Sequence, residues 1–331
     1  MTTGVQTKVK GVRIEEYGGP QVMKFSSYEL PPPGRGEARV KLSAAGVNFI
    51  DIYQRRGRYP VALPYTLGLE GAGTVESIGE GVTEVKVGDR VAYSYGPGSY
   101  AQANNVPAKV LIPLPSDLDF EQGAALPLQG MTAHYLLHEF HKLKPGETVL
   151  IHAAAGGMGL LLVQWAKHLG ARVIGTVSSE EKAKAAKEAG ADEVIVYSKT
   201  DFVEESKRLT NGNGPVFIID GVGKDTFTKD LDAVALRGHV VIYGAASGVA
   251  DPLLPNSLQV RSITVSGGSL FNYIATREDL LMRANAVIKG IKEGWLKLKV
   301  GHVLPLDQAI KAHEMLEGRA TTGKIVLNCQ V

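Results

Sequence analysis

The chain has 331 residues, of which 44% are hydrophobic and 21% are charged. This length and composition predict a globular protein with about two domains. The 36 lysine and arginine residues nearly balance the 34 aspartate and glutamate residues, which leaves a net charge of +2. No broad positive field therefore favours nucleic acid or an anionic membrane as the main partner.

The single cysteine, Cys329, excludes internal disulfides and metal sites built from several cysteines. The first ten residues lack the apolar core of a secretion signal. No run approaches the ~18 apolar residues that a membrane-spanning helix needs. We therefore expect a cytoplasmic protein that makes no membrane contact.

The first third of the chain is rich in short apolar runs. Residues 12–17, 37–45 and 71–78 are alternating or continuous apolar segments between glycine and proline residues, which predicts strands. Residues 81–91 are expected to close a hairpin-rich, barrel-like region. We expect a mostly-β domain over residues 1–127.

From about Gly123 the pattern changes to strands separated by helices. Alternation of this kind predicts an α/β fold with a doubly wound parallel sheet, here over residues 128–268. The helices are expected around 121–141 and 180–189, and the six strands near 149–152, 172–177, 193–197, 216–220, 239–243 and 262–266.

The last segment, 269–331, is expected to return to the first domain. Thr276 and Asp279 have the spacing of a capping box, which predicts a helix that ends near Gly294. A strand, a helix over 307–317 and a final strand over 324–327 follow.

The most informative stretch is residues 149–159, where an apolar strand runs into a glycine-rich turn that opens a helix. Gly156 would let the backbone approach a pyrophosphate, and Gly159 would let the helix pack closely on the strand. Ala154 takes the place of the first glycine of the G-x-G-x-x-G template. The helix is expected to stop at Gly170. The pattern predicts a dinucleotide site.

Five sequence blocks now carry a family resemblance. The blocks 44–53, 67–75, 87–91, 152–159 and 322–327 occur in the order found in the medium-chain dehydrogenase/reductase superfamily. Within it, the chain resembles the zinc-free quinone oxidoreductases related to zeta-crystallin. This resemblance implies a GroES-like, mostly-β catalytic domain followed by a Rossmann nucleotide-binding domain.

The chain also resembles the zinc alcohol dehydrogenases, with a difference at the metal. Where those enzymes carry a cysteine, a histidine and a second cysteine, this chain has Asn48, Leu69 and Leu128. Leucine offers no metal ligand and an amide is a poor one, so we expect no metal. An acceptor that is already electrophilic, a quinone or an α,β-unsaturated carbonyl, then suits a nicotinamide best.

The block 44–53 is the one that the family uses to line the nicotinamide pocket. We expect Tyr53 to donate a hydrogen bond or a proton to the acceptor oxygen, and Asn48 to orient the acceptor or the nicotinamide. The alternative is a buried tyrosine and a turn asparagine without a catalytic role. Asp51 is the third candidate of the catalytic group, expected to hold Asn48 or a backbone amide rather than to act as a base.

Further residues of the first domain have two interpretations each. Glu70 either keeps the family's role beside the lost metal position or makes a structural hydrogen bond. Arg55 and Tyr59 are candidates for an outer cleft. With Arg56 and Arg58, Arg55 forms the densest basic patch, interpreted first as a solvated loop and second as a phosphate or substrate contact.

The predicted cofactor is NADPH rather than NADH. The strand 172–177 ends without the carboxylate that binds an adenosine ribose. Lys182 and Tyr197 match the residues that flank the 2′-phosphate in quinone oxidoreductases, and a cation and a hydroxyl suit that group. Ser178 with Glu181 predicts the start of a helix. The cofactor contacts that the resemblance implies are Thr132, Ala154, Gly156, Gly157, Met158, Gly159, Ser178, Lys182, Tyr197, Gly221, Gly223, Tyr243, Gly244, Ser269, Leu270 and Lys324.

The histidines predict no metal centre. His134, His138 and His141 have helical spacing but no implied partner, so we expect a surface or interdomain stripe. His152 is expected to be a buried, hydrogen-bonded strand residue.

The leading hypothesis is thus an NADPH-dependent, zinc-independent quinone oxidoreductase. The first alternative is an enone or alkenal double-bond reductase of the same superfamily. The second is AU-rich RNA binding, as among zeta-crystallin-like proteins, which the near-neutral charge disfavours. The resemblance also implies a homodimer through the edge strand 261–266.

Overall fold

The computed structural model describes residues 6–319 and 321–330. Two compact units divide the chain. Of the described residues, the first contains 6–128, Thr276–Ala284, 300–319 and 321–330, and the second contains Gln129–Ala275 and Asn285–Lys299. The C-terminal part therefore returns to the first unit in two pieces, rather than as one segment from residue 269. No helix among the described residues has the length and apolarity to span a membrane.

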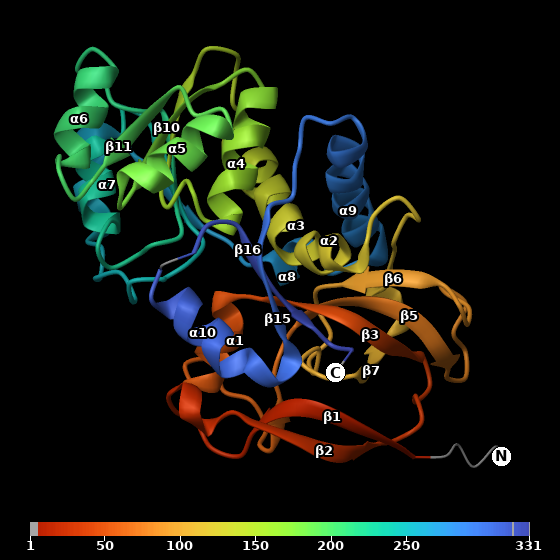
Figure 1. Ribbon diagram of the computed structural model, residues 1–331. Coiled ribbons are helices and arrows are strands. Elements are labelled where there is room, and N and C mark those ends of the chain that lie inside the picture. Colours follow the sequence, from red (N-terminus) through yellow and green to blue (C-terminus); the bar gives the residue numbers. More distant parts are fainter. Residues whose placement is uncertain (1–5, 320, 331) are drawn as a thin grey trace. The chain divides into compact units, whose positions relative to one another are not determined.

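The first unit is built on strands, as the sequence predicts (Figure 1). A three-stranded sheet has the order β2-β1-β4, and a seven-stranded sheet has the order β15-β16-β3-β5-β6-β8, with β7 also paired to β3. The strands are β1 (Thr7–Ile14), β2 (Lys24–Leu30), β3 (Glu37–Val47), β4 (Tyr65–Thr66), β5 (Glu70–Ile78), β6 (Arg90–Tyr93), β7 (Ala103–Pro107), β8 (Ile112–Pro113), β15 (Val300–Pro305) and β16 (Lys324–Asn328).

Buried apolar side chains from these strands form one core, which includes Val40, Val75, Val91 and Leu327. The strand predicted over residues 12–17 instead spans Thr7–Ile14 (β1). It ends at Ile14 because Glu15 and the residues up to the Gly18–Gly19 turn lie outside the pairing with β2. Three helices accompany the sheets, namely α1 (Phe49–Arg55), α2 (Phe120–Ala125) and α10 (Ala309–Glu317), with short 3₁₀ turns at Pro20–Val22, Ala108–Val110 and Leu306–Gln308.

The second unit contains the predicted doubly wound parallel sheet. Its order is β11-β10-β9-β12-β13-β14, and every neighbouring pair is parallel. The strands are β9 (Thr148–Ile151), β10 (Arg172–Val177), β11 (Glu193–Val196), β12 (Phe217–Asp220), β13 (His239–Ile242) and β14 (Thr264–Gly267).

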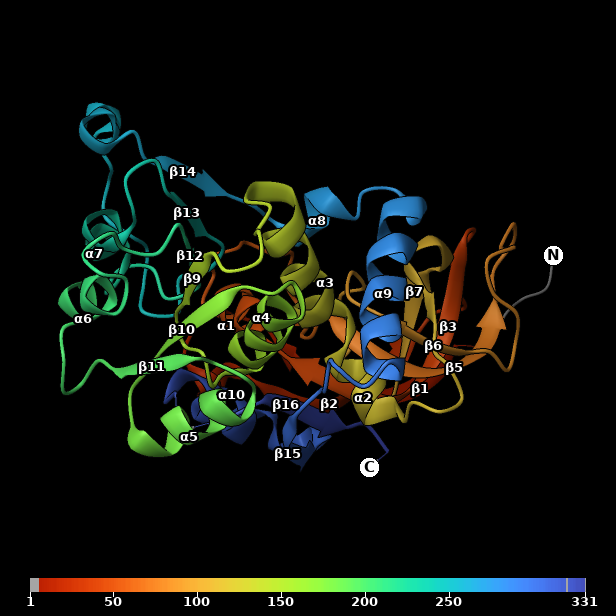
Figure 2. The ribbon, with the colours of Figure 1, turned by 90° about the horizontal axis from the view of Figure 1, so that it is seen from above.

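Four helices of this unit form two pairs. In Figures 1 and 2, α4 and α5 lie together, and α6 and α7 lie together on the other side of β10. Pro127 begins a new helix and breaks the predicted 121–141 segment, because proline disfavours a helical residue before it. The helices are α3 (Pro127–Tyr135) with a π turn (Leu136–Phe140), α4 (Gly157–His168), α5 (Glu180–Glu188), α6 (Phe202–Leu209), α7 (Phe227–Ala233), a 3₁₀ helix (Pro255–Arg261) and α8 (Leu270–Tyr273). A further helix, α9 (Arg277–Lys292), belongs to the first unit up to Ala284 and to the second from Asn285.

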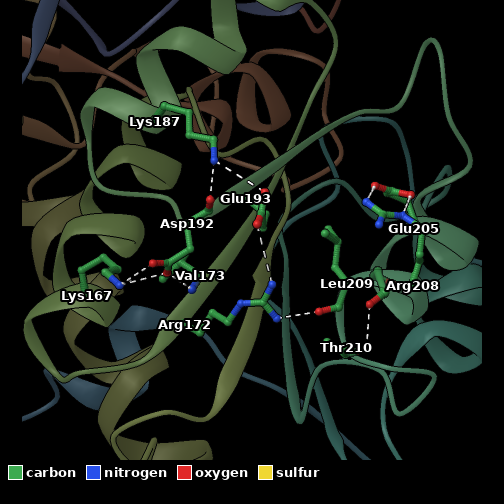
Figure 3. Close-up of polar contacts among 11 residues, drawn as sticks. Lys167, Arg172, Val173, Lys187, Asp192, Glu193, Glu205, Arg208, Leu209 and Thr210 are labelled. Carbon is green, nitrogen blue, oxygen red and sulfur yellow. Dashed lines mark hydrogen bonds and ion pairs between the residues drawn. The ribbon is translucent and has the colours of Figure 1, made fainter.

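A polar cluster fastens helices to the amino ends of β10 and β11 (Figure 3). The carboxylate of Asp192 accepts from Lys167 Nζ at 2.8 and 2.9 Å and from Val173 N at 2.7 Å, while its carbonyl accepts from Lys187. Arg172 donates to the carbonyl of Leu209 at 2.7 Å. These contacts join α4, α5 and α6 to the amino edge of the sheet.

Candidate active site

The glycine-rich turn joins β9 to α4 at the carboxyl edge of the parallel sheet. Gly156 is the N-cap of α4, a helix of 12 residues, so the first N–H groups of this helix are available to an anion. A Cβ atom added to Gly156 would meet only Ala153 O, at 3.3 Å. A Cβ atom added to Gly159 would lie 2.2 Å from the same oxygen. Gly156 thus leaves open space and Gly159 permits close packing, as predicted.

The left-handed residue of this turn is Ala153, with φ of 50°. The sequence template instead points to Ala154, whose methyl group packs where a Cβ atom on Gly175 would stand, 2.7 Å away. An alanine at positive φ is strained by about 1 kcal/mol or more. The sequence therefore identifies the turn correctly but not the residue that makes it.

The residues predicted to bind the 2′-phosphate lie at the ends of β10 and β11 and at the start of α5. The strands are parallel, and Ser198 Oγ donates to Ser178 O at 3.1 Å, so Ser178 and Tyr197 follow adjacent strands. Tyr197 is exposed, and Lys182 lies in the first turn of α5. The helix cap is Ser179, which accepts from Lys182 N at 3.3 Å, so the expected cap by Ser178 is wrong by one residue.

The carboxyl ends of β12 and β13 also meet closely. A Cβ atom on Gly244 would lie 2.7 Å from Gly221 O, and one on Gly221 would lie 2.6 Å from the ring of Tyr243. Gly223 has φ of 89°. Four predicted cofactor residues thus lie at one edge of the sheet. Ser269 precedes α8, Leu270 begins it, and Thr132 is a buried residue of α3.

In the first unit, Asn48, Glu70 and Lys324 form one buried hydrogen-bonded cluster. Lys324 Nζ donates to Asn48 Oδ1 and to Glu70 Oε2, each at 2.6 Å. Asn48 Nδ2 donates to Glu70 Oε2 at 2.9 Å. The opposite charges fix the amide orientation, because its oxygen faces the ammonium and its nitrogen faces the carboxylate. The cluster joins the ends of β3, β5 and β16.

Gly46 and Leu128 complete the surroundings of Glu70. Leu128 N donates to Glu70 Oε1 at 2.6 Å. A Cβ atom on Gly46 would lie 2.3 Å from Glu70 Oε2 and 2.2 Å from Ala124 O, so only glycine leaves room for the carboxylate. Glu70 therefore makes the structural hydrogen bonds that one of our two interpretations expects.

Asp51 holds the backbone of Asn48, as expected. Its Oδ2 accepts from Asn48 N at 2.9 Å and from Tyr100 Oη at 3.0 Å. Burial raises the pKa of Asp51 to about 7, against the opposing effect of these two hydrogen bonds. Asp51 thus fixes the start of α1, where Asn48 is the N-cap.

A chain of buried groups continues from Asp51 to α10. His313 Nε2 lies 3.2 Å from Tyr100 Oη, and His313 Nδ1 lies 2.9 Å from Arg55 Nη1. A guanidinium can only donate, so Nδ1 accepts and Nε2 carries the proton. Burial, followed by the Arg55 charge, lowers the pKa of His313 to about 3. Neutral His313 donates to Tyr100, which donates to Asp51.

Arg55 is fully buried, which corrects its expected place in an outer cleft and in a solvated basic patch. It also pairs with Glu317 at 2.8 Å. Tyr59 is 46% exposed, and its ring packs edge-on against Tyr53 with centroids 5.5 Å apart. The Arg58 guanidinium lies 4.5 Å from the centre of the Tyr53 ring. Tyr53 therefore sits in a cationic, aromatic setting.

The histidines of the second unit contact aromatic rings. His134 is buried, stacks on His138 and packs at a right angle to the ring of Trp165, so the surface alternative of the expected stripe is wrong for His134. His152 is buried and hydrogen-bonded as predicted, although it directly follows β9. Its ring nitrogens lie 2.8 Å from Thr176 Oγ1 and 2.7 Å from Asp230 Oδ1.

Metal-binding groups of three or more histidine, cysteine, aspartate or glutamate residues are absent from the part of the chain that the structure describes. At the positions of the zinc ligands of alcohol dehydrogenases, Leu69 and Leu128 offer no donor side chain, and the amide of Asn48 is bound to Glu70 and Lys324.

Two family models match the chain. The model described as "Alcohol dehydrogenase GroES-like domain" matches residues 34–116, and the one described as "Zinc-binding dehydrogenase" matches residues 157–285. A quinone oxidoreductase of Pseudomonas aeruginosa is 44% identical over 321 residues, which cover 96% of this chain and 99% of the relative. The chain belongs to the quinone oxidoreductase family of medium-chain dehydrogenases/reductases.

One solved structure and one further relative support this family assignment. The crystal structure of Escherichia coli quinone oxidoreductase complexed with NADPH has a TM-score of 0.94 and 41% identity, and covers 96% of this chain and 99% of its own. A 2-haloacrylate reductase of a Burkholderia species is 44% identical, covering 95% of this chain and 97% of the relative. The predicted GroES-like and Rossmann architecture is confirmed.

Sequence reasoning missed Tyr100 and His313, which belong to no motif. It placed Lys324 among the cofactor contacts, whereas the structure places its ammonium beside Asn48 and Glu70. A contact of Lys324 with the cofactor stays a prediction. A sequence signal for the buried position of Lys324 was available in the block 322–327, where this lysine begins an otherwise apolar predicted strand.

Proposed function

We propose that this protein is an NADPH-dependent oxidoreductase that transfers a hydride to quinones without the help of a metal ion. The observation that carries the proposal is the similarity to quinone oxidoreductases over nearly the full length of the chain. Two neighbouring structures, from Escherichia coli and from a mycobacterium, are complexes with NADPH.

The turn after β9 fits the pyrophosphate of this cofactor. The open space at Gly156 would receive the phosphates, and the N–H groups at the start of α4 would bind them. Ser178, Lys182 and Tyr197 would hold the 2′-phosphate with two hydroxyls and one cation. When bound, NADPH supplies the hydride and the two electrons.

Residues of the first unit would donate hydrogen bonds and a proton to the acceptor oxygen. Tyr53 would donate a hydrogen bond, and then a proton, to the oxygen that gains negative charge. The second amide N–H of Asn48 makes only a 3.4 Å contact with Gly46 O, a weak bond that an acceptor oxygen can replace. Asp51 would keep Asn48 in place through its backbone N–H.

Steady-state kinetics with NADPH and NADH test the proposal. With an ortho-quinone as acceptor, we expect kcat/KM to favour NADPH by about tenfold or more, ~1.4 kcal/mol. Lys182→Ala should remove most of this preference, because it deletes the only cation proposed for the 2′-phosphate. Lys184→Ala, on the same helix, is the control and should keep it. Equal use of both cofactors by the unmodified protein would contradict the proposal.

A second candidate is the reduction of an activated carbon–carbon double bond. The 44% identity to a 2-haloacrylate reductase favours it, and the chemistry differs only in which conjugated acceptor receives the hydride. A panel of ortho-quinones, enones and 2-haloacrylates with NADPH separates the two. A kcat/KM that is highest for the alkenes would assign the protein to the second candidate.

A further inference from the structure

Lys324 places a positive charge inside the cluster that we assign to the acceptor. Its ammonium donates to Glu70 and Asn48, each at 2.6 Å, and its side chain is 3% exposed. Burying an ammonium and a carboxylate is costly even when they pair, and apolar residues of similar size often stabilise a fold as well. A role beyond folding would explain why the cluster contains this pair.

The two partners of this ion pair differ in what they can offer to a ligand. The Glu70 carboxylate is fully buried and accepts from Lys324, Asn48 and Leu128 N. An ammonium has three N–H groups. Two of those on Lys324 have acceptors, and no acceptor for the third is found among the described residues. Glu70 has no exposed surface, whereas Asn48 is 4% and Lys324 is 3% exposed.

The same cluster adjoins two of the positions that carry metal ligands in the zinc alcohol dehydrogenases. Lys324 contacts Asn48, at the first of these positions, and its partner Glu70 binds the backbone of Leu128, at the last. A Lewis acid at this place stabilises negative charge on a substrate oxygen. The Lys324 ammonium brings positive charge directly beside Asn48, at the first of these positions.

We propose that Lys324 provides the positive charge that stabilises the oxyanion formed when the acceptor is reduced, with Glu70 and Asn48 holding the ammonium in place. This inference rests on the proposed function. The acceptor receives a hydride from NADPH, which is oxidised to NADP⁺, and the two electrons of the hydride leave negative charge on the conjugated oxygen. That oxygen then takes one proton, which solvent ultimately replaces.

The alternative is that Lys324 only neutralises Glu70. The double variant Glu70→Gln/Lys324→Met separates these roles, because it removes both charges and keeps the shapes. If the pair is structural alone, this variant folds and keeps its kcat. If Lys324 acts on the oxyanion, kcat falls by about 10²-fold, the usual effect of losing one group that stabilises such an anion. Lys311→Met, an exposed change on α10, is the matched control.

A second readout does not depend on turnover. 4-Nitrophenol, whose phenolate absorbs visible light, imitates the product oxyanion. In the presence of NADP⁺, and at a pH where the free probe is mostly protonated, the unmodified protein and Lys311→Met should bind it as the phenolate. The double variant should bind it as the neutral phenol or not at all. Thermal unfolding and fluorescence titration with NADPH verify folding and cofactor affinity.

Three results would overturn the inference. The first is a folded double variant with unchanged kcat, and the second is a double variant that still binds the phenolate. The third is a double variant whose rate is restored by saturating NADPH, which would assign Lys324 to the cofactor. If the unmodified protein reduces neither quinones nor activated alkenes, the proposed function fails, whereas the phenolate titration still tests Lys324.

Discussion

The buried, neutral ring of His313 makes the stability of the first unit depend on pH. Its pKa is lowered to about 3 in the folded protein, against about 6.5 in an unfolded chain. The stability that it contributes is therefore present above pH 6.5 and lost as the pH falls toward 3. Between pH 7 and 5 we expect a loss of about 2 kcal/mol in the free energy of unfolding.

Chemical denaturation of the unmodified protein and of His313→Gln measures this effect. The variant starts from lower stability, because it disturbs the contacts to Arg55 and Tyr100, but it should lack this component of the pH dependence. NMR should show a His313 ring that stays neutral at pH 5 in the native protein. A ring that titrates near pH 6.5 would contradict the assignment of its protons.

Tyr53 is the proposed hydrogen-bond and proton donor. Tyr53→Phe keeps the ring that packs against Tyr59 and Arg58 and removes only the hydroxyl. We expect kcat with a quinone to fall by about 10²-fold, with the affinity for NADPH unchanged. Tyr95→Phe, an exposed tyrosine of the same unit, is the control. Equal kcat for both variants would mean that Tyr53 does not donate.

Residue type alone did not determine these roles. Arg55, Arg56 and Arg58 look alike in the sequence, yet Arg55 is buried against His313, the Arg56 side chain is 59% exposed and Arg58 covers the ring of Tyr53. The partner of Arg55 lies 258 residues away in the chain. Local pattern cannot predict such a contact, because the return of α10 to the first unit creates it.

At the scale of elements, the turn between β9 and α4 contains two glycines, Gly156 and Gly159, whose replacement by alanine should have different effects. Gly159→Ala would place a Cβ atom 2.2 Å from Ala153 O and 2.6 Å from Ala154 Cα, both backbone atoms. The helix must then move away from the strand, which should cost about 1–3 kcal/mol of stability. Gly156 has φ of −74° and open space around it, so Gly156→Ala should keep the stability of the fold.

The two variants should therefore separate packing from binding. Gly156→Ala should weaken NADPH binding, because its methyl group occupies the space that we assign to the pyrophosphate. Calorimetry and fluorescence titration measure both quantities. If Gly156→Ala binds NADPH as tightly as the unmodified protein, the pyrophosphate lies elsewhere.

Elements with strong periodicity were predicted well, and their ends less so. The strand ranges of the parallel sheet agree with β9 to β13 within one residue at each end, because apolar runs bounded by glycine mark buried strands. β14 begins at Thr264, later than expected, since Pro255–Arg261 forms a 3₁₀ helix. The helix cap at Ser179 rather than Ser178 is an error of the same kind.

At the scale of the whole chain, the order β11-β10-β9-β12-β13-β14 is the one typical of the doubly wound fold that the sequence predicts. The sheet of the first unit does not follow from local pattern. There β16 pairs with β3, through Ile325 and Val47, and β15 runs parallel to β16. The sequence predicts the return of the C-terminal segment, but the partner strand depends on contacts nearly 280 residues apart in the chain.

The homodimer that the resemblance implies would use the free edge of β14. Among the described residues, β14 pairs only with β13. Thr264 N donates toward β13, to Gly238 O at 3.0 Å, so the N–H of the next residue, Val265, points to the open edge because successive N–H groups alternate in direction. We propose that two copies join their β14 strands.

Val265→Pro tests this edge directly. Proline removes the outward N–H of Val265 and leaves the pairing with β13, and proline is tolerated in edge strands. We expect the unmodified protein to sediment as a dimer and Val265→Pro as a folded monomer with an unchanged far-ultraviolet circular dichroism spectrum. Val265→Thr, which keeps the N–H, should remain dimeric. If the unmodified protein is a monomer, the proposed interface does not exist. If the Val265→Pro variant is still a dimer, the interface lies elsewhere.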